Sequence, residues 1–265
     1  RQGVTSFLAA TVCCHRERKR PKVLLLMSGR KAGSCCLGIY LEGPFINQAR
    51  KGAIKDEFIA DFGFRPRDLG LEKILRLYPG LRIMAIAPEL PGTGKLIREL
   101  RKHGVIASFG HSDAGHKEAR RGVKSGIRHV THLFNAMRKW NEPDPSYVAL
   151  LADKRVMAEV IADGRHLLTK ILRTVVKKFG MDRIILVSDA TGGKGLYAPA
   201  RLAGTSLPLI ELVRRMKRFC GIGIEGALRM ATYNPAKALA AKAGYIGRGY
   251  PADMIVLDRK MRLRK

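Results

Sequence analysis

Six acidic and imidazole side chains stand out because each follows a short apolar run with the composition of a β-strand. They are Glu42, His111, His132, Asp163, His166 and Asp189. When parallel strands close into a barrel, their carboxyl ends converge on one face, and enzymes of this architecture build their active sites there. The sequence therefore predicts that these six side chains gather at one face of the fold.

A carboxylate and two imidazoles at such a face suit a divalent transition metal such as zinc, with one position left open for water. A bound metal lowers the pKa of that water towards ~7 and so supplies a nucleophile at neutral pH. A further carboxylate, Asp189, can accept the proton of the water and return it to a leaving group. Metal-assisted hydrolysis is the chemistry that this set of residues predicts.

Each of these residues taken alone has a simpler interpretation. A single histidine at a strand end is more often a hydrogen-bonded structural residue, and Asp189, followed by Ala-Thr-Gly-Gly, can equally cap a turn. Three other histidines, His103, His116 and His129, lack the strand-end placement and are expected to be structural or to lie at the surface. The functional prediction therefore depends on the six residues as a set.

Short β-rich runs alternate with helical stretches along the chain. The seven predicted strands before Asp189 are Val4–Val12, Leu37–Leu41, Arg82–Ala87, Val105–Phe109, His129–Phe134, Val156–Ile161 and Ile184–Val187. The predicted helices are a basic amphipathic one ending near Arg30, then Asp68–Leu77, Gly94–His103, Asp113–Ser125, Leu168–Phe179, Leu207–Phe219 and Ile224–Leu239. In the last of these, Asn234-Pro235 offers an alternative break, with Asn as the cap of a short helix.

Strands that alternate with helices at this spacing indicate an α/β protein with a parallel sheet and crossover helices. A TIM-like (β/α)8 barrel is the favoured architecture, and a doubly wound sheet is the alternative. No G-x-G-x-x-G follows a predicted strand, which weakens the dinucleotide-binding version of the doubly wound fold.

The composition excludes several classes of protein. The chain has 265 residues, 46% of them hydrophobic, and 50 Lys+Arg against 22 Asp+Glu give a net charge of +28. The apolar fraction is that of a globular domain rather than a disordered chain. No apolar run approaches the roughly 20 residues of a membrane-spanning helix, so we expect no membrane association.

The positive charge raises the question of nucleic-acid binding. Basic residues are spread along the whole chain, aromatic residues make up 6%, and no base-stacking motif, zinc finger or basic zipper is present. We therefore expect a generally basic surface without specific nucleic-acid recognition. The five cysteines form two adjacent pairs and one single residue, which is no disulfide framework, so a reducing cytoplasm is the expected location.

Five ordered segments around these polar residues resemble those of a known family. They are Leu41-Glu42-Gly43-Pro44-Phe45-Ile46-Asn47, Gly110-His111-Ser112, Thr131-His132-Leu133-Phe134-Asn135-Ala136-Met137, Ile161-Ala162-Asp163-Gly164-Arg165-His166 and Val187-Ser188-Asp189-Ala190. They resemble the N-acetylglucosamine-6-phosphate deacetylases of the metal-dependent amidohydrolase superfamily. Segments near the carboxyl terminus, including Leu202-Ala203-Gly204 and Ala231-Thr232-Tyr233-Asn234-Pro235, extend the resemblance over nearly the whole chain.

The resemblance implies hydrolysis of the N-acetyl group of N-acetylglucosamine 6-phosphate, giving glucosamine 6-phosphate and acetate. It implies a divalent metal, zinc or iron(II), held by Glu42, His111 and His132, with Asp189 as the catalytic acid and base. It also implies substrate-binding roles, with the phosphate at Asn135 and Ala136, further contacts from Asp163 and His166, and a sugar site lined by Leu202, Ala203 and Gly204. A homodimer, in which one subunit helps to close the phosphate site of the other, is a further implication.

The chain departs from the family pattern in four places. It has no His-x-His and one predicted barrel strand too few at its amino terminus, and the segment from Asp189 to Gly204 is short. Ile54 stands where the family has a histidine near the acyl group, and Asn141 where it has an arginine for the phosphate. We therefore expect a fragment, a truncated gene product or a decaying copy, with activity open to test.

The expected organisation is an incomplete barrel in residues 1–245 and one strand of a small β-sandwich in residues 246–265, at Met254–Leu257. Two other functions remain open. One is a different amidohydrolase reaction, by a deaminase or a cyclic amidase. The other is an inactive relic that binds polyanions through its charge, with an affinity that falls steeply as salt rises.

Overall fold

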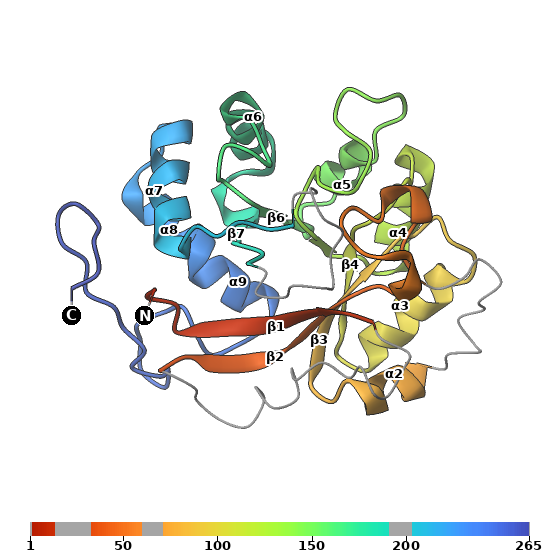
Figure 1. The fold of residues 1–265 in the computed structure, drawn as a ribbon, viewed down its shortest axis with the longest axis horizontal. Helices are drawn as coiled ribbons and strands as arrows, with labels where there is room; N and C mark the ends of the chain where they lie inside the picture. Colours follow the sequence, from red (N-terminus) through yellow and green to blue (C-terminus); the bar gives the residue numbers. More distant parts are fainter. Residues whose placement is uncertain (1, 14–32, 60–70, 191–202, 265) are drawn as a thin grey trace.

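Seven parallel strands form one curled sheet in which spatial order follows chain order from β1 to β7 (Figure 1). The computed structural model describes residues 2–13, 33–59, 71–190 and 203–264. The strands are β1 (Ser6–Val12), β2 (Cys35–Glu42), β3 (Leu81–Ile86), β4 (Ile106–Phe109), β5 (His129–Val130), β6 (Met157–Val160) and β7 (Ile184–Leu186). A doubly wound sheet reverses its strand order partway, so the sequential order excludes that alternative.

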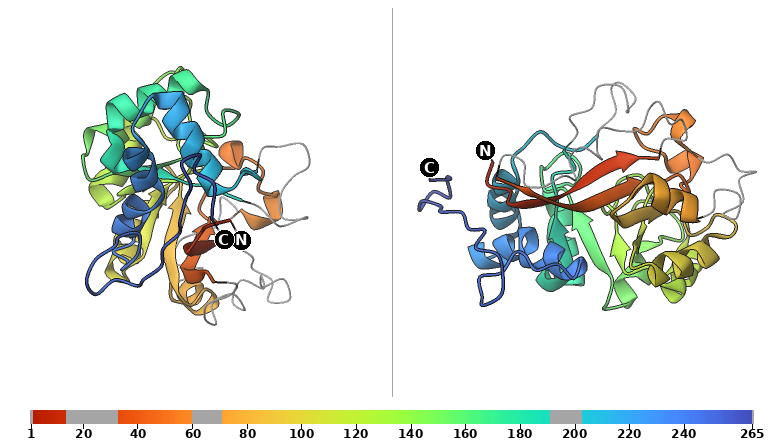
Figure 2. Two further views of the ribbon diagram at one scale, coloured as in Figure 1. Left: turned by 90° about the vertical axis from the view of Figure 1, so that its left-hand side faces the viewer. Right: turned by 90° about the horizontal axis from the view of Figure 1, so that it is seen from below.

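Helices follow most strands and lie against one side of the curled sheet (Figures 1 and 2). They are α2 (Leu71–Leu77), α3 (Thr93–Lys102), α4 (His116–Ser125), α5 (Tyr147–Ala152), α6 (Thr169–Phe179), α7 (Leu209–Cys220), α8 (Ile224–Ala231) and α9 (Tyr233–Ala238). In α3 the buried residues Leu96, Ile97 and Leu100 form one apolar stripe, whereas Arg98 and Arg101 lie on other faces. None of the described helices is long and apolar enough to cross a membrane.

Alternation along each strand gives the sheet two chemically different faces. In β2, Ile39 and Leu41 join the large apolar core shared with the helices, whereas Tyr40 and Glu42 point to the opposite, inner face. The same period of two places Ser108 of β4 and Glu159 of β6 among polar partners on the inner side. The inner face is therefore partly polar, although the barrel interiors of such folds are usually filled with branched apolar residues.

The predicted strand at residues 129–134 and the predicted helix at residues 224–239 differ from the observed elements. The predicted strand His129–Phe134 ends at Val130, because His132 and Phe134 take left-handed backbone angles (φ 27° and 66°) that no strand continues through. Two helices, α8 and α9, which meet at Thr232, replace the predicted helix Ile224–Leu239. Asn234 lies inside α9 and does not cap it. The buried Asn234 amide instead donates to the carbonyls of Met181 and Ile184. These two hydrogen bonds hold α9 against the start of β7.

The carboxyl-terminal segment contains no strand among its described residues. The expected strand Met254–Leu257 is replaced by irregular chain with one antiparallel bridge between Leu257 and Leu263. The division at residue 246 stays a prediction. The predicted basic helix ending near Arg30 lies outside the described residues, as does the beginning of the helix predicted at Asp68–Leu77.

Candidate active site

Glu42, His111 and His132 form a buried cluster at the carboxyl ends of β2, β4 and β5. Each offers one ligand atom, and the three atoms lie within 4.8 Å of one another. His111 Nε2 lies 3.1 Å from Glu42 Oε2 and 3.2 Å from His132 Nε2. The sequence prediction that these three residues meet is therefore correct in its geometry, whereas their role as ligands belongs to the proposal below.

The protonation of the cluster suits a cation. His111 Nδ1 lies 3.2 Å from the carbonyl oxygen of Arg50, so Nδ1 carries the proton and Nε2 presents its lone pair to the cluster. Burial and the neighbouring His111 lower the pKa of His132 to about 4, which keeps that imidazole neutral. Although burial opposes it, the neighbouring imidazoles of His111 and His132 lower the pKa of Glu42.

The backbone aims these side chains through an uncommon conformation. His111, His132 and Asp189 have φ angles of 50°, 27° and 48°, in the left-handed region that non-glycine residues seldom occupy. Such angles cost of order 1–3 kcal/mol each and persist only where the surroundings enforce them. Each of the three strands thus ends in a sharp turn that directs its side chain across the face of the sheet.

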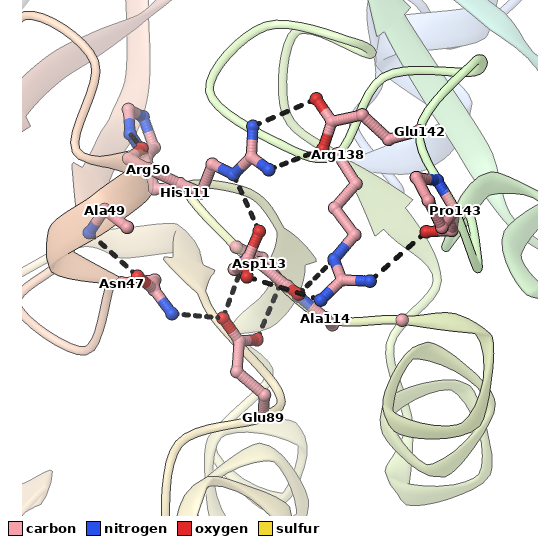
Figure 3. Close-up of polar contacts among 12 residues, drawn as sticks. Asn47, Ala49, Arg50, Glu89, His111, Asp113, Ala114, Arg138, Glu142 and Pro143 are labelled. Atoms are coloured by element: carbon pink, nitrogen blue, oxygen red, sulfur yellow. Dashed lines mark hydrogen bonds and ion pairs between the residues drawn. The ribbon is translucent and has the colours of Figure 1, made fainter.

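A network of polar side chains joins the loops that follow β2 to β5 (Figure 3). Arg50 Nε donates to Asp113 Oδ1 at 2.8 Å, and the Arg50 guanidinium also makes a two-pronged ion pair with Glu142. Arg138 donates to the backbone oxygen of Asp113 at 2.7 Å. The bond from Arg50 lowers the pKa of Glu142. These contacts hold together the loops that surround His111.

Glu89, which follows β3, completes this network. One of its oxygens accepts the Asn47 amide at 3.0 Å and the Asp113 backbone N–H at 2.7 Å, and the other accepts the Ser112 hydroxyl at 2.7 Å. The backbone N–H of Asn47 donates to the His111 carbonyl at 2.8 Å. Glu89 and Asn47 therefore fix the backbone on both sides of His111.

Asp163 and His166 form a separate pair in the turn after β6. His166 Nδ1 lies 2.7 Å from Asp163 Oδ2, and the backbone N–H groups of Arg165 and His166 both donate to Asp163 Oδ1 at 2.8 Å. Although burial opposes it, these bonds lower the pKa of Asp163. His166 Nε2 is buried and has no hydrogen-bond partner among the described residues. It is therefore available to a polar group from outside the chain.

Asp189 lies just beyond β7, within electrostatic range of the cluster. Burial, with the charges of Glu42 and Glu159, raises the pKa of Asp189 well above its usual range. The segment that begins at Ala203 returns beside it, and Thr205 donates its N–H to the Ser188 carbonyl at 3.0 Å. A Cβ atom added to Gly204 would lie 1.5 Å from the Asp189 carbonyl oxygen, so only glycine fits there. Leu202 lies outside the described residues.

The remaining predicted residues lie around this centre. Asn135 donates its side-chain amide to the carbonyls of His132 and Leu133, and the Ala136 carbonyl accepts the N–H of Ser112 at 3.1 Å. Ile54 is buried among Val12, Ile46 and Phe58, and Asn141 is exposed.

The sequence did not predict the buried polar groups beneath the cluster. Glu159 Oε2 accepts the His132 backbone N–H at 3.2 Å and the Tyr40 hydroxyl at 3.4 Å. Ser108, His129 and Thr131 continue the network through bonds of 2.6 to 2.9 Å. Burial lowers the pKa of His129 to about 4 and raises that of Glu159 to about 8. The available signal was an acidic residue inside the apolar run Met157-Ala158-Glu159-Val160.

A buried cluster at the strand ends of a curled parallel sheet agrees with the family that the sequence matches. The Amidohydrolase family model matches residues 1–264, and the chain belongs to this family.

Individual relatives place the chain more closely. The N-acetylglucosamine-6-phosphate deacetylase of Bos taurus is 32% identical, with 99% of this chain aligned to 71% of that protein. The deacetylase of Lysinibacillus sphaericus is 29% identical, with 100% of this chain aligned to 74% of the relative. Within the amidohydrolases, the chain therefore groups with the N-acetylglucosamine-6-phosphate deacetylases.

Solved structures agree with this placement. The Mycobacterium smegmatis deacetylase, a mutant in complex with N-acetyl-D-glucosamine-6-phosphate, superimposes with a TM-score of 0.85 at 27% identity. The match covers 99% of this chain and 75% of that one. The Thermotoga maritima deacetylase gives a TM-score of 0.84 at 27% identity, covering 99% and 77%. The seven-stranded sheet is thus the TIM-like amidohydrolase fold.

Proposed function

We propose that the protein hydrolyses the N-acetyl group of N-acetylglucosamine 6-phosphate, giving glucosamine 6-phosphate and acetate in a metal-dependent reaction. The observation that carries this proposal is the buried cluster of Glu42, His111 and His132, with Asp189 beside it, in a chain that groups with these deacetylases.

The cluster fits a divalent cation. Three possible ligand atoms lie within 4.8 Å of one another in a buried space, a spacing at which one cation can contact all three. Glu42, His111 and His132 would hold the ion, with zinc or iron(II) the metals expected for such a set. A divalent ion there would polarise the acyl oxygen and acidify the attacking water.

Asp189 is suited to move the proton. Its raised pKa makes the carboxylate a stronger base towards the proton of the attacking water. In this proposal the Asp189 carboxylate first takes the proton of the attacking water and then delivers it to the departing nitrogen. The amine then leaves neutral rather than as an amide anion, and atoms and charges balance.

The substrate-binding roles are assigned to residues around this centre. The buried His166 Nε2 would bond a substrate oxygen, because Asp163 already occupies the other ring nitrogen and Nε2 has no partner among the described residues. Asn135 and Ala136 would receive the phosphate, and Ala203 and Gly204, with Leu202, would line the sugar. Because Ile54 is apolar and buried in its own cluster, it cannot donate to the developing oxyanion, and a missing donor can lower the rate ~10²–10³-fold.

The direct test is acetate release from N-acetylglucosamine 6-phosphate by protein loaded with zinc, iron(II) or cobalt. We expect turnover that stops on chelation and returns when metal is restored. Free N-acetylglucosamine serves as the control substrate and should react more slowly, since it lacks the phosphate. Absence of acetate from every metal-loaded form, or turnover unaffected by chelation, would contradict the proposal. A deaminase or cyclic-amidase substrate that reacts faster would favour the other amidohydrolase reaction.

Binding of polyanions is a second candidate, supported by one observation. A cavity of about 570 Å³ between the end of α7 and the turn at residues 259–261 is lined by several cations and by no acid. The cations are Arg214, Lys217, Arg218, Arg259 and Lys260. Titration with DNA should show an affinity that falls with log salt by about 0.9 per phosphate contact. Absent or salt-insensitive binding would remove this candidate. A homodimer and a cytoplasmic location stay predictions, which size measurement and cell fractionation test.

A further inference from the structure

Glu159 occupies an unusual position beneath the cluster. Its side chain is 7% exposed on the inner face of β6, yet it belongs to none of the ligand sets found among the described residues. The carboxyl group therefore does something other than bind the ion directly.

The contacts of Glu159 converge on the turn that presents His132. Regular pairing between β5 and β6 ends at Val130 and Ala158. Beyond that point, the Glu159 carbonyl accepts the Leu133 N–H at 2.8 Å, and its carboxyl group accepts the His132 N–H at 3.2 Å. One residue thus satisfies two consecutive N–H groups of a turn that has left the sheet.

This support is needed because of the backbone angle at His132. A φ of 27° is unfavourable for a histidine, and a buried N–H without an acceptor costs a further ~1–3 kcal/mol. Among the described residues, the acceptor of that N–H is the Glu159 side chain rather than a backbone carbonyl of β6. Without the side-chain acceptor, the turn would relax and carry the imidazole away from Glu42 and His111.

We infer that Glu159 is a positioning residue, which holds the left-handed turn at His132 through its side-chain oxygen and thereby sets the geometry of the metal cluster. This inference rests on the proposed metal site. A hydrogen-bond acceptor of this length is the essential property, so a glutamine at this position retains the function and an alanine or aspartate does not.

The test uses the whole protein and cobalt(II) as the probe, with the dissociation constant and the visible d–d spectrum as measurements. We expect Glu159→Gln to bind cobalt within about threefold of the unmodified protein. Glu159→Ala should bind at least ~10-fold more weakly with an altered spectrum, the effect usual for groups that orient ligands. In Glu159→Asp the side chain is one methylene shorter, so its oxygen lies farther from the His132 N–H. This variant should resemble Glu159→Ala, and it replaces that variant in the test if Glu159→Ala does not fold.

Ser108→Ala is the matched control, because it removes a hydroxyl of the same buried network whose hydrogen bonds go to His129 and Thr131 rather than to Glu159 or the His132 N–H. It should lower the melting temperature and leave cobalt affinity unchanged. Hydrogen exchange of the metal-free protein gives a second measurement, with faster exchange at residues 131–133 in Glu159→Ala but not in Glu159→Gln.

The outcomes separate the two proposals. If the unmodified protein binds no cobalt, the proposed metal site fails, while the exchange measurement still tests the role of Glu159 in the turn. If the unmodified protein binds cobalt and Glu159→Ala binds it equally well, the positioning role is overturned. Equal weakening in Ser108→Ala and Glu159→Ala would also overturn it, because a general loss of packing would then explain both.

Discussion

The two halves of the strand-end face are held in different ways. The loops after β2 to β5 are joined to one another by side chains, with Arg50, Glu89 and Glu142 each contacting a loop other than its own. The turns after β6 and β7 are held mostly from within or by adjacent backbone, as at Asp163 with its own following N–H groups. A cluster of side chains from three strands needs its loops fixed relative to one another, whereas a turn that presents a single side chain can be fixed locally.

The same contrast predicts which substitutions act at a distance. A change in the cross-linked half should alter the metal cluster even when the residue does not contact it. A change in the locally held half should affect only the turn that contains it. Four substitutions test this difference.

Asp189→Asn should have the largest effect. The amide cannot carry the proton from water to amine, so we expect kcat to fall by ~10³-fold, within the range usual for general acid–base groups. Cobalt affinity should stay close to that of the unmodified protein, because Asp189 is not among the cluster's ligands. Acetate release and cobalt titration measure the two quantities. Asp182→Asn, which changes an exposed carboxylate near the same strand, is the control.

Gly204→Ala should have the next largest effect. The new methyl group would overlap the Asp189 carbonyl, and the φ of 64° adds strain for any residue with a side chain. We expect kcat to fall by roughly 10²-fold through displacement of Asp189, since small errors in placing a catalytic group are costly. Gly223→Ala, at an open position with φ −63°, should leave kcat unchanged. Equal activity in both variants would show that the segment at Gly204 does not position Asp189.

Arg50→Ala tests the cross-linked half directly. Its ion pairs are partly exposed, so we expect a stability loss of about 1 kcal/mol, or a fall in melting temperature of a few degrees. Because the Arg50 side chain holds the loop whose backbone carbonyl bonds His111, cobalt affinity should also weaken by about 10-fold. The control, Lys102→Ala, removes an exposed pair on α3 and should change neither. Unchanged cobalt affinity in Arg50→Ala would mean that the loops are held independently.

Asp163→Asn should give the smallest effect on the cluster of Glu42, His111 and His132, and its effect on stability should depend on pH. Because the folded pKa of Asp163 lies below 3.8, the ionised form adds stability above that pH and loses it as the pH falls through the folded pKa. The variant should therefore be less stable than the unmodified protein at pH 6, and the difference should shrink below about pH 3.8. Denaturant unfolding at several pH values measures this. A stability difference that stays constant with pH would contradict the lowered pKa of Asp163. A change in cobalt affinity would contradict the view that the turn after β6 is held locally.

Much of the fold was predictable from the sequence. Alternating apolar runs and helical stretches identified all seven strands before Asp189, because burial against a helix layer imposes a readable period on each element. Boundaries were less predictable where hydrogen bonding ends a strand while the apolar pattern continues. At β5 the pattern runs to Phe134, but the backbone turns after Val130.

The candidate site divides in the same way. The sequence by itself predicted which residues come together at the strand ends, since Glu42, His111, His132 and Asp189 are side chains of the right type at the ends of apolar strands. It also identified the family through ordered motifs. These features depend on short stretches of sequence, so they can be recognised without the tertiary structure.

Only the tertiary structure decided how those residues are held. The left-handed turn at His132, the Arg50 contacts across three loops and the close approach of Gly204 to Asp189 all depend on segments far apart in the chain. Glu159 shows the reason most clearly. Its acceptor role exists because β6 lies beside the turn after β5, and that adjacency, unlike the type of the residue, arises when the sheet assembles.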